Sequence, residues 1–252
     1  MPLPGWASGW SGGSDARGAT VRRHPPPHDL SPSITRRAPW FRARLLGWFA
    51  ANRRPFPWRE PGRAPYEIVI AEILLQRTPA ATVARVYDAF MERFPAWSAL
   101  AASTPDDLRP LLEPLGLWQV RAGILARVAQ AMEANGGVVP SSRPELERIT
   151  GIGQYTAAAI LLVVHGQAEP LLDANMARVL ERYFGPRTRA DIRDDPYLHA
   201  LARQIVRGPR SLDINWAILD VAALVCQARR PLCDQCPVRA RCAYANRVEV
   251  YP

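Results

Sequence analysis

The segment that decides the fold reads Ile149-Thr150-Gly151-Ile152-Gly153-Gln154-Tyr155-Thr156-Ala157-Ala158-Ala159-Ile160. Two glycines flank one aliphatic residue just before an apolar run, so the turn can bring bare backbone N–H groups to the positive N-terminus of the following helix. Such a turn suits a phosphate, although an ordinary tight turn between two helices can have the same sequence. Asp173 follows eighteen residues after Tyr155 and adds a carboxylate to this region.

The composition is that of a basic globular protein. The 252 residues are 48% hydrophobic, and 32 basic residues against 23 acidic ones give a net charge of +9. This excess of positive charge favours a polyanionic partner. All 32 basic residues are arginine, because the sequence contains no lysine. The composition therefore excludes covalent catalysis through a lysine Schiff base.

The N-terminal segment, from residue 1 to about residue 37, is rich in Gly, Ser, Pro and Arg. Such a composition cannot bury a core, so we expect a disordered basic tail. No basic start leads into a continuous apolar run in the first forty residues, and we expect neither a signal peptide nor a membrane span. The sequence predicts a cytoplasmic protein whose cysteines are reduced or metal-bound.

Helical patterns recur along the rest of the chain, with no convincing pair of strands. The segment from Trp40 to Ala51 has apolar residues at helical spacing, and Pro65 opens a second helix that is apolar nearly all round. Glu72 lies in that second helix, where a carboxylate is costly unless it has a functional task or a partner in the core. These patterns predict an all-α fold.

The segment between these two helices, residues 53–59, places an aromatic side chain among arginines and prolines. Its two prolines end the preceding helix. We expect either a Pro-Trp turn that packs on the core or a phosphate contact made by Arg53 or Arg59.

All four cysteines lie within seventeen residues, with gaps of six, two and five: Cys226, Cys233, Cys236 and Cys242. A reducing compartment argues against disulfides, and four clustered thiolates indicate a tetrahedral metal or an iron-sulfur cluster. Zinc ribbons usually pair two Cys-x-x-Cys knuckles, whereas only Cys233 and Cys236 have that spacing here. The spacing alone leaves both zinc and iron-sulfur open.

Two motifs in this order resemble those of one family. The segment 149–173 resembles the helix-hairpin-helix of the superfamily of DNA base-excision glycosylases that includes endonuclease III, and the cysteine spacing is similar to the iron-sulfur loop of its endonuclease III and adenine glycosylase branches. The resemblance implies an all-α fold of two helical subdomains with the active-site cleft between them. The expected parts are a six-helix barrel with the hairpin (61–170) and an iron-sulfur cluster subdomain (38–60 and 171–252). It also implies a 4Fe-4S cluster on the four cysteines, with zinc as the alternative.

Within the superfamily, the chain looks closest to the Mig-type thymine glycosylases that act on G·T mismatches and to the MutY-type adenine glycosylases. Tyr155 stands where bifunctional members carry the lyase lysine, which implies a monofunctional enzyme. Arg77 stands where adenine glycosylases typically have glutamine, and the segment 117–122 departs from their Gly-Tyr-Tyr turn. The sequence ends ten residues after Cys242, so we also expect no C-terminal domain that reads 8-oxoguanine. Thymine or uracil opposite guanine is the implied target. Adenine opposite 8-oxoguanine or guanine is the alternative, as is a non-catalytic protein that binds damaged DNA.

The implied partner is double-stranded DNA with a mismatched or damaged base, bound by a monomer associated with the nucleoid. A base inside a duplex cannot reach a buried carboxylate, so the nucleotide must be flipped out. We expect the hairpin to hold the adjacent phosphate, and either Arg77 or Trp118 to fill the vacated space in the stack. The predicted DNA contacts are Gly151, Gly153, Gln154, Thr156, Arg77 and Trp118.

Three residues are the predicted catalytic groups. Asp173 would stabilise the positive charge that builds on the sugar while orienting a water molecule. Glu72 would supply a proton or hydrogen bond to the leaving base if burial raises its pKa. Tyr155 would position the sugar or Asp173, unless it only packs between the two subdomains.

Overall fold

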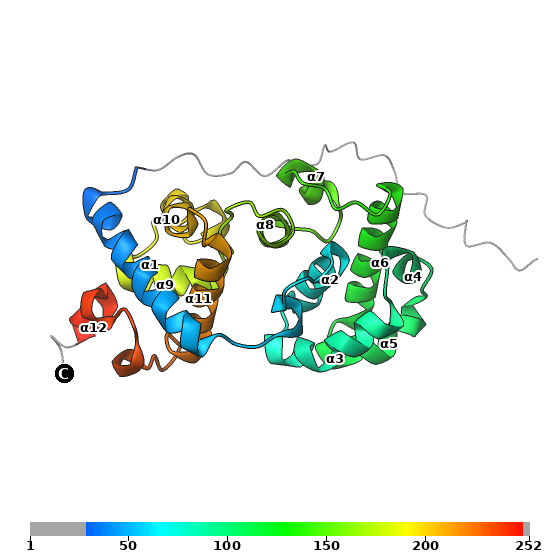
Figure 1. Ribbon diagram of the computed structural model, residues 1–252, viewed down its shortest axis with the longest axis horizontal. Coiled ribbons are helices and arrows are strands. Elements are labelled where there is room, and N and C mark those ends of the chain that lie inside the picture. Colours follow the sequence, from blue (N-terminus) through cyan, green and yellow to red (C-terminus); the bar gives the residue numbers. More distant parts are fainter. Residues whose placement is uncertain (1–28, 249–252) are drawn as a thin grey trace, which may run out of the picture.

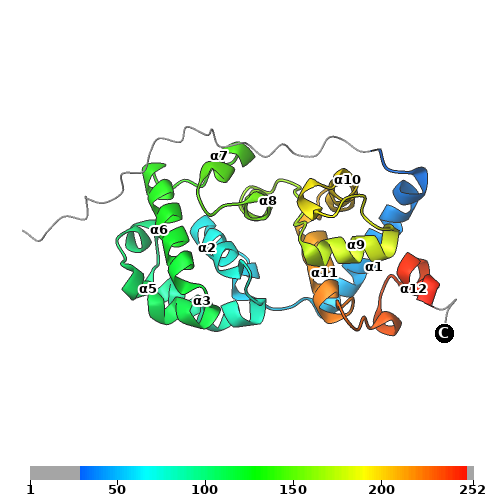
Figure 2. The same cartoon turned by 180° about the vertical axis from the view of Figure 1, so that it is seen from behind.

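The computed structural model describes residues 29–248, and that part of the chain is helical with no strand. The predicted all-α fold is confirmed. The helices form two bodies that lie side by side (Figure 1), and the view from behind shows the same division (Figure 2). None of the helices between residues 29 and 248 combines the length and the apolar character needed to cross a bilayer.

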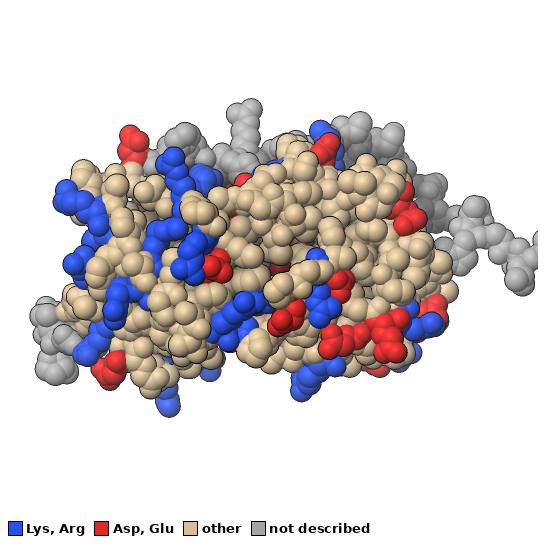
Figure 3. All heavy atoms as spheres, in the orientation of Figure 1, with Lys and Arg blue, Asp and Glu red and all other residues tan. Residues whose placement is uncertain are grey.

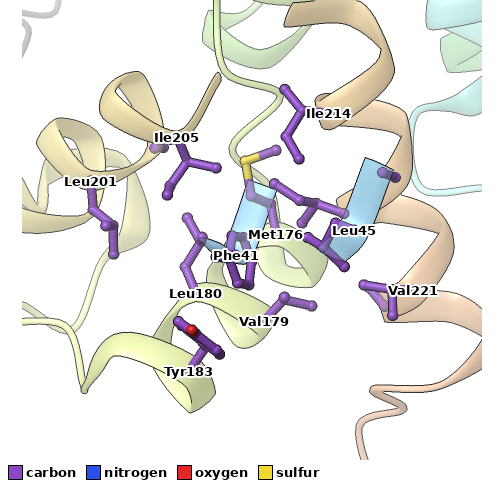
Figure 4. Packing of buried hydrophobic residues seen from close by; sticks show 14 of the residues in the cluster. Phe41, Leu45, Met176, Val179, Leu180, Tyr183, Leu201, Ile205, Ile214 and Val221 are labelled. Carbon is purple, nitrogen blue, oxygen red and sulfur yellow. The ribbon is translucent and has the colours of Figure 1, made fainter. Parts of the chain in front are cut away.

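The first body, here the terminal body, joins the two ends of the described chain. Its helices are α1 (Pro32–Asn52), α9 (Ala174–Phe184), α10 (Pro196–Val206), α11 (Ser211–Leu224) and α12 (Ala243–Val248). Their buried side chains include Phe41 and Leu45 of α1, Leu180 of α9 and Ile214 of α11, which meet in one core (Figure 4). Each such side chain contributes about 1.5–3 kcal/mol by leaving water. This core therefore fixes helices that are more than a hundred residues apart in sequence.

The second body, here the central body, is built from consecutive helices. They are α2 (Pro65–Leu75), α3 (Ala80–Arg93), α4 (Trp97–Ala101), α5 (Pro105–Leu112), α6 (Trp118–Ala134) and α7 (Arg143–Arg148). Short turns join neighbours, and α6 packs on both α4 and α5. Helix α2 is buried on most sides, as its apolar sequence predicts.

Helix α8 (Gln154–Val163) lies at the junction of the two bodies (Figure 1). Its side chains divide between the two cores: Ala159 and Leu162 enter that of the terminal body, whereas Ala157, Ile160 and Leu161 enter that of the central body. A helix with apolar residues all round can pack on two partners at once. The hairpin that precedes α8 is thereby held at the boundary between the bodies.

The start of α1 differs from the expected boundary of the tail. Residues 1–28 of the predicted tail lie outside the described residues, but α1 begins at Pro32 instead of after residue 37. Proline suits the first helical position because its missing N–H would have no partner there. Ile34 and Ala38 are buried, so this first stretch of the helix has core contacts that its composition concealed.

Candidate active site

The hairpin runs from α7 to α8 through a turn that requires glycine at its first position. Gly151 has φ +106°, a backbone conformation that residues with a side chain rarely adopt. A Cβ atom there would also lie 2.4 Å from Cγ2 of Ile124 on α6. Ile152 is buried and anchors the turn in the core of the central body. The turn is therefore fixed by both backbone conformation and close packing.

The N-terminus of α8 is open. Its N-cap is Gly153, which is exposed, has no capping side chain, and would carry a Cβ with nothing within 4 Å. The first N–H groups of a helix have no partner within it and attract anions. Gln154 follows at the first helical position, half-buried. The N-terminus of α8 is thus accessible, and the phosphate contact that the glycine pattern predicts stays a prediction.

Thr156 lies inside the protein and not at the surface, where a DNA contact was expected. Its side chain is buried, and its hydroxyl accepts a hydrogen bond from Nε2 of Gln76 (3.2 Å). The same Gln76 nitrogen donates to the carbonyl oxygen of Gly151 (2.9 Å). The Thr156 side chain therefore ties the hairpin to the end of α2 and is not presented to a ligand.

Two exposed turns next to the hairpin contain left-handed residues other than glycine. Arg77 has φ +58° and Leu117 has φ +52°. The buried guanidinium of Arg121 donates to the carbonyl of Ile73 (2.8 Å) and to the hydroxyl of Thr78 (2.9 Å), so it braces the first turn. Strained residues of this kind persist where the surrounding structure holds them, and they are frequent at functional sites.

Leu117, and not Trp118, forms the tip of the second turn. The Leu117 side chain is 61% exposed and that of Val120 is 60% exposed. Trp118 is half-buried, with the guanidinium of Arg109 lying 5.3 Å from its ring centroid. Leu117 is therefore better placed than Trp118 to fill the space that a flipped base leaves in the stack. No local pattern distinguishes the two side chains, since both residues stand in the same apolar segment.

Asp173 is the N-cap of α9. Its carboxylate accepts the backbone N–H groups of Asn175 (2.9 Å) and Met176 (2.8 Å), and also Nδ2 of Asn175 (2.7 Å). Three donors therefore hold the carboxylate in one orientation. The residue is half-buried and borders an open hollow of about 620 Å³, which Arg187 and Arg193 also line.

Glu72 projects from the middle of α2 with an unsatisfied oxygen. Its Oε2 atom is buried and has no hydrogen-bond partner among the described residues. Burial raises the pKa of Glu72 to about 7, against the opposing effect of the positive charge on Arg59. A carboxyl group of this kind is protonated to a large extent near neutral pH, and it can act as an acid.

The charges of both carboxyl groups act on the hydroxyl of Tyr155. Burial is the main reason that its pKa lies well above the usual value, and the negative charges of Glu72 and Asp173 raise it further. Tyr155 is therefore a neutral hydroxyl within electrostatic reach of both carboxyl groups. The structure thus brings together three predicted catalytic residues from α2, α8 and the start of α9.

The segment 53–59 packs on the core and does not present Arg59 to a phosphate. Trp58 is buried and stacks on Phe56 with 4.9 Å between ring centroids. Arg59 is only 7% exposed and pairs with Asp220 on α11 (2.9 Å). The phosphate contact suggested for Arg59 is wrong, because a side chain this deeply buried cannot reach a ligand at the surface.

Hydrogen bonds continue from Asp173 to the first cysteine. Asn175 donates to Asp173, and Nη2 of Arg178 donates to the Asn175 side chain (3.1 Å). Nε of Arg178 donates to the carbonyl oxygen of Cys226 (2.9 Å). Arg182 lies one turn further along α9 and donates to carbonyl oxygens of the cysteine loop at Gln227 and Ala228. Helix α9 thus fixes both the carboxylate and the start of the cysteine loop.

The four cysteines line one pocket beside α9 and α12: Cys226, Cys233, Cys236 and Cys242. All four are free thiols. Among residues 29–248, no three His, Cys, Asp or Glu side chains lie close enough together to hold a single metal ion. Both zinc and iron-sulfur clusters are held by four sulfur donors of this kind, so the cofactor on these cysteines stays a prediction.

Charged side chains are unevenly spread over the face seen in Figure 3. Arginines gather over the terminal body, whereas acidic side chains gather at the edge of the central body over α3 and α5. The arginine-rich face of the terminal body favours contact with a phosphate backbone.

Comparison with known proteins gives a consistent result. Residues 70–194 match the family described as HhH-GPD superfamily base excision DNA repair protein. Thymine-DNA glycosylase of Aeropyrum pernix is 39% identical over 212 residues, which cover 81% of this chain and 94% of that protein. Human adenine DNA glycosylase is 34% identical, over 83% of this chain but 40% of that protein. The solved structure of a thermostable thymine-DNA glycosylase superposes with a TM-score of 0.80 at 31% identity, covering 85% of this chain and 99% of that one.

Proposed function

Because the chain belongs to the HhH-GPD superfamily of base-excision DNA repair proteins and is a DNA glycosylase, we propose that it hydrolyses the N-glycosidic bond of thymine or uracil opposite guanine. The observation that carries this proposal is the convergence of Glu72, Tyr155 and Asp173 next to the open end of the hairpin helix. The relatives named thymine-DNA glycosylase support the choice of base.

Binding begins with the DNA backbone. The free N–H groups at Gly153 and the positive end of α8 hold a phosphate beside the target nucleotide. A mismatched pair is less stable, so its base costs less to turn out of the stack. Arg77 and Leu117 stand at the tips of braced turns, where a side chain can enter the space that the base leaves.

Asp173 acts on the sugar. Breaking the N-glycosidic bond builds positive charge at the sugar, and a carboxylate already held by three donors stabilises that charge without reorganising. The same carboxylate orients the attacking water molecule. The hollow beside Asp173 leaves room for both sugar and water.

Glu72 acts on the leaving base. Its buried oxygen has no partner within the described chain, so a base oxygen or nitrogen can take that place. Near neutral pH the raised pKa of about 7 leaves a proton available for donation. The charges of both carboxyl groups act on Tyr155, which orients the nucleoside through its neutral hydroxyl.

The enzyme is monofunctional. A lyase step through an imine needs an amine at the sugar, and the chain has a phenol, Tyr155, at the relevant position and no lysine anywhere. The expected products are a free base and an intact strand that carries an abasic site.

We further propose that the four cysteines hold a 4Fe-4S cluster. The shared pocket and the all-sulfur donor set support this choice, and the cysteine spacing, which resembles the iron-sulfur loop of the family, favours it over zinc. When bound, the cluster cross-links the loop to the rest of the terminal body and takes no part in hydrolysis. Arg178 and Arg182 keep the loop next to α9 through its carbonyl oxygens.

The test uses purified protein and duplexes with G·T, G·U or adenine opposite 8-oxoguanine. Alkali cleaves abasic sites, so strand scission after alkali reports base release. We expect scission of the G·T and G·U duplexes after alkali and none before it. Preferential action on the adenine duplex would favour the alternative target. The absence of scission on all three would favour a DNA-binding protein without activity.

A further inference from the structure

A buried group of charges lies where the first connection between the two bodies meets α11. Asp220 is completely buried. It accepts hydrogen bonds from the backbone N–H of Arg54 (3.0 Å), from Nε of Arg54 (2.7 Å) and from Nη1 of Arg59 (2.9 and 3.0 Å to its two oxygens). Both oxygens of the carboxylate are thus satisfied, and the two guanidiniums leave one positive charge in excess.

This group of charges crosses the junction between the bodies. Asp220 belongs to α11 of the terminal body, whereas Arg59 ends η1 (Pro57–Arg59), whose Trp58 packs in the core of the central body. Trp216, one turn before Asp220, lies beneath the Arg59 guanidinium with 4.9 Å to its ring centroid. The chain passes from α1 to α2 at this point (Figure 1). The ion pair therefore joins η1, which packs on the Glu72-bearing helix α2, to the body that carries Asp173.

Stability does not account for such a pair. Replacing a buried ion pair by apolar side chains of similar size is often neutral or stabilising, because desolvating two charges is costly. A buried pair that joins two bodies is better explained by the position and the charge that it fixes.

The charged and titratable groups around Glu72 include Arg59. Arg59 is the cation whose charge acts on both Glu72 and Tyr155. The negative charges of Glu72 and Asp173 both act on the Tyr155 hydroxyl of α8, and the positive charge of Arg59 opposes them. The other groups packed on α2 are engaged elsewhere. Arg121 of α6 binds the carbonyls of Ile73 and Leu74, and Tyr87 of α3 donates to the carbonyl of Glu67.

We propose that Asp220 and Arg59 are a positioning pair for base release. The pair holds Glu72 of the central body at a fixed place relative to Asp173 of the terminal body, and it keeps a positive charge beside the leaving base. This inference rests on the proposed glycosylase function. It assigns roles to two residues that do not touch the sugar.

The positive charge of Arg59 assists base release because the base gains electrons when the glycosidic bond breaks. As the bond between sugar carbon and base nitrogen breaks, its electron pair stays on the base, while the oxygen of water bonds to the sugar carbon. Glu72 gives its proton to the base and regains one from the attacking water, so the products are free base and sugar hydroxyl. Before protonation is complete the base carries negative charge, and a buried cation nearby stabilises it.

The experiment compares Arg59→Gln, Arg59→Lys and Asp220→Asn with the wild-type chain. Single-turnover base release from a G·U duplex is measured across pH, and DNA affinity is measured separately. Asp213→Asn is the matched control, since Asp213 lies on the same helix in an exposed ion pair with Arg210. The control should leave the rate unchanged. For Arg59→Gln and Asp220→Asn, we expect a rate loss of about 10- to 100-fold with little change in DNA affinity.

The pH profile distinguishes positioning from general damage. The positive charge of Arg59 opposes the raised pKa of Glu72. Its removal should therefore move the fall in rate on the alkaline side to higher pH. Arg59→Lys keeps the positive charge but loses the planar guanidinium that binds both oxygens of Asp220. Its rate should therefore fall without a shift of the pH profile. Arg59→Lys also decides the matter if Arg59→Gln does not fold.

Leaving groups supply an independent readout. A more acidic base, such as 5-fluorouracil, depends less on outside stabilisation of its negative charge. The loss in Arg59→Gln should therefore be smaller for 5-fluorouracil than for thymine. Equal losses for all bases together with an unshifted pH profile would overturn the inference. If the wild-type chain released no base from any duplex, the glycosylase proposal itself would fail, which is a separate outcome.

Discussion

Gly151 gives a prediction that tests the hairpin directly. Replacement by alanine places a Cβ at φ +106° and only 2.4 Å from Cγ2 of Ile124. A side chain in the left-handed region costs about 1–2 kcal/mol, and overpacking a well-packed site costs about 1–3 kcal/mol. The two together predict a loss of about 2–5 kcal/mol in the free energy of unfolding.

The assay is thermal unfolding together with DNA binding. For a domain of this size, 1 kcal/mol lowers Tm by about 2–4 °C, so Gly151→Ala should lower Tm by about 4–20 °C. Affinity for a mismatched duplex should fall as well, because the turn cannot keep the α8 amides in place. A second substitution, Ile124→Ala, removes the overlapping atoms. In a double-mutant cycle, this substitution should restore the part of the lost unfolding free energy that comes from steric overlap. The part that comes from the left-handed backbone conformation should remain.

Gly153→Ala is the matched control for stability. Gly153 has an ordinary φ of −94°, and an added Cβ meets nothing within 4 Å. Its Tm should therefore stay the same or rise slightly, since alanine restricts the unfolded chain more than glycine does. A Gly151→Ala variant with the Tm and DNA affinity of the wild-type chain would refute the reasoning about this turn.

The remaining predictions concern the site itself. Asp173→Asn should abolish base release while mismatch affinity, measured by anisotropy, stays within about threefold; substantial turnover would remove Asp173 from the mechanism. With Glu72 as the acid, the single-turnover rate should fall as pH rises through about 7, and Glu72→Gln should lose that dependence together with most of the rate. Leu117→Ala should slow base release from a G·T duplex without lowering Tm, because the side chain is 61% exposed, whereas Trp118→Phe should have a smaller effect on the rate.

Much of the fold is visible in local sequence patterns. The apolar run after Gly153 predicts a helix that is buried on several sides, and α8 indeed packs on both cores. The same reasoning identifies Glu72 as a carboxyl group in an apolar helix, and its Oε2 atom is indeed buried, without a hydrogen-bond partner among residues 29–248. These features depend on residues within a few positions of each other.

Other features of the site have no local signal. Leu117 and Trp118 are adjacent in sequence, but one is exposed at the tip of a turn and the other lies under Arg109. Thr156 stands next to Tyr155, yet its hydroxyl is used by Gln76 from another helix. Whether such a side chain faces a ligand or the core depends on neighbours that are distant in sequence.

Local patterns were enough to predict the helical class, the glycine turn, the clustering of the cysteines and the candidate acidic residues, because backbone conformation, spacing and side-chain chemistry are properties of short segments. The pairing of Arg59 with Asp220 became visible only in the packed molecule. The tertiary structure also brought Glu72, Tyr155 and Asp173 from three elements to one site. The physical reason is that contacts between the two bodies depend on how the two cores close around α8, and no pattern within a single helix encodes that closure.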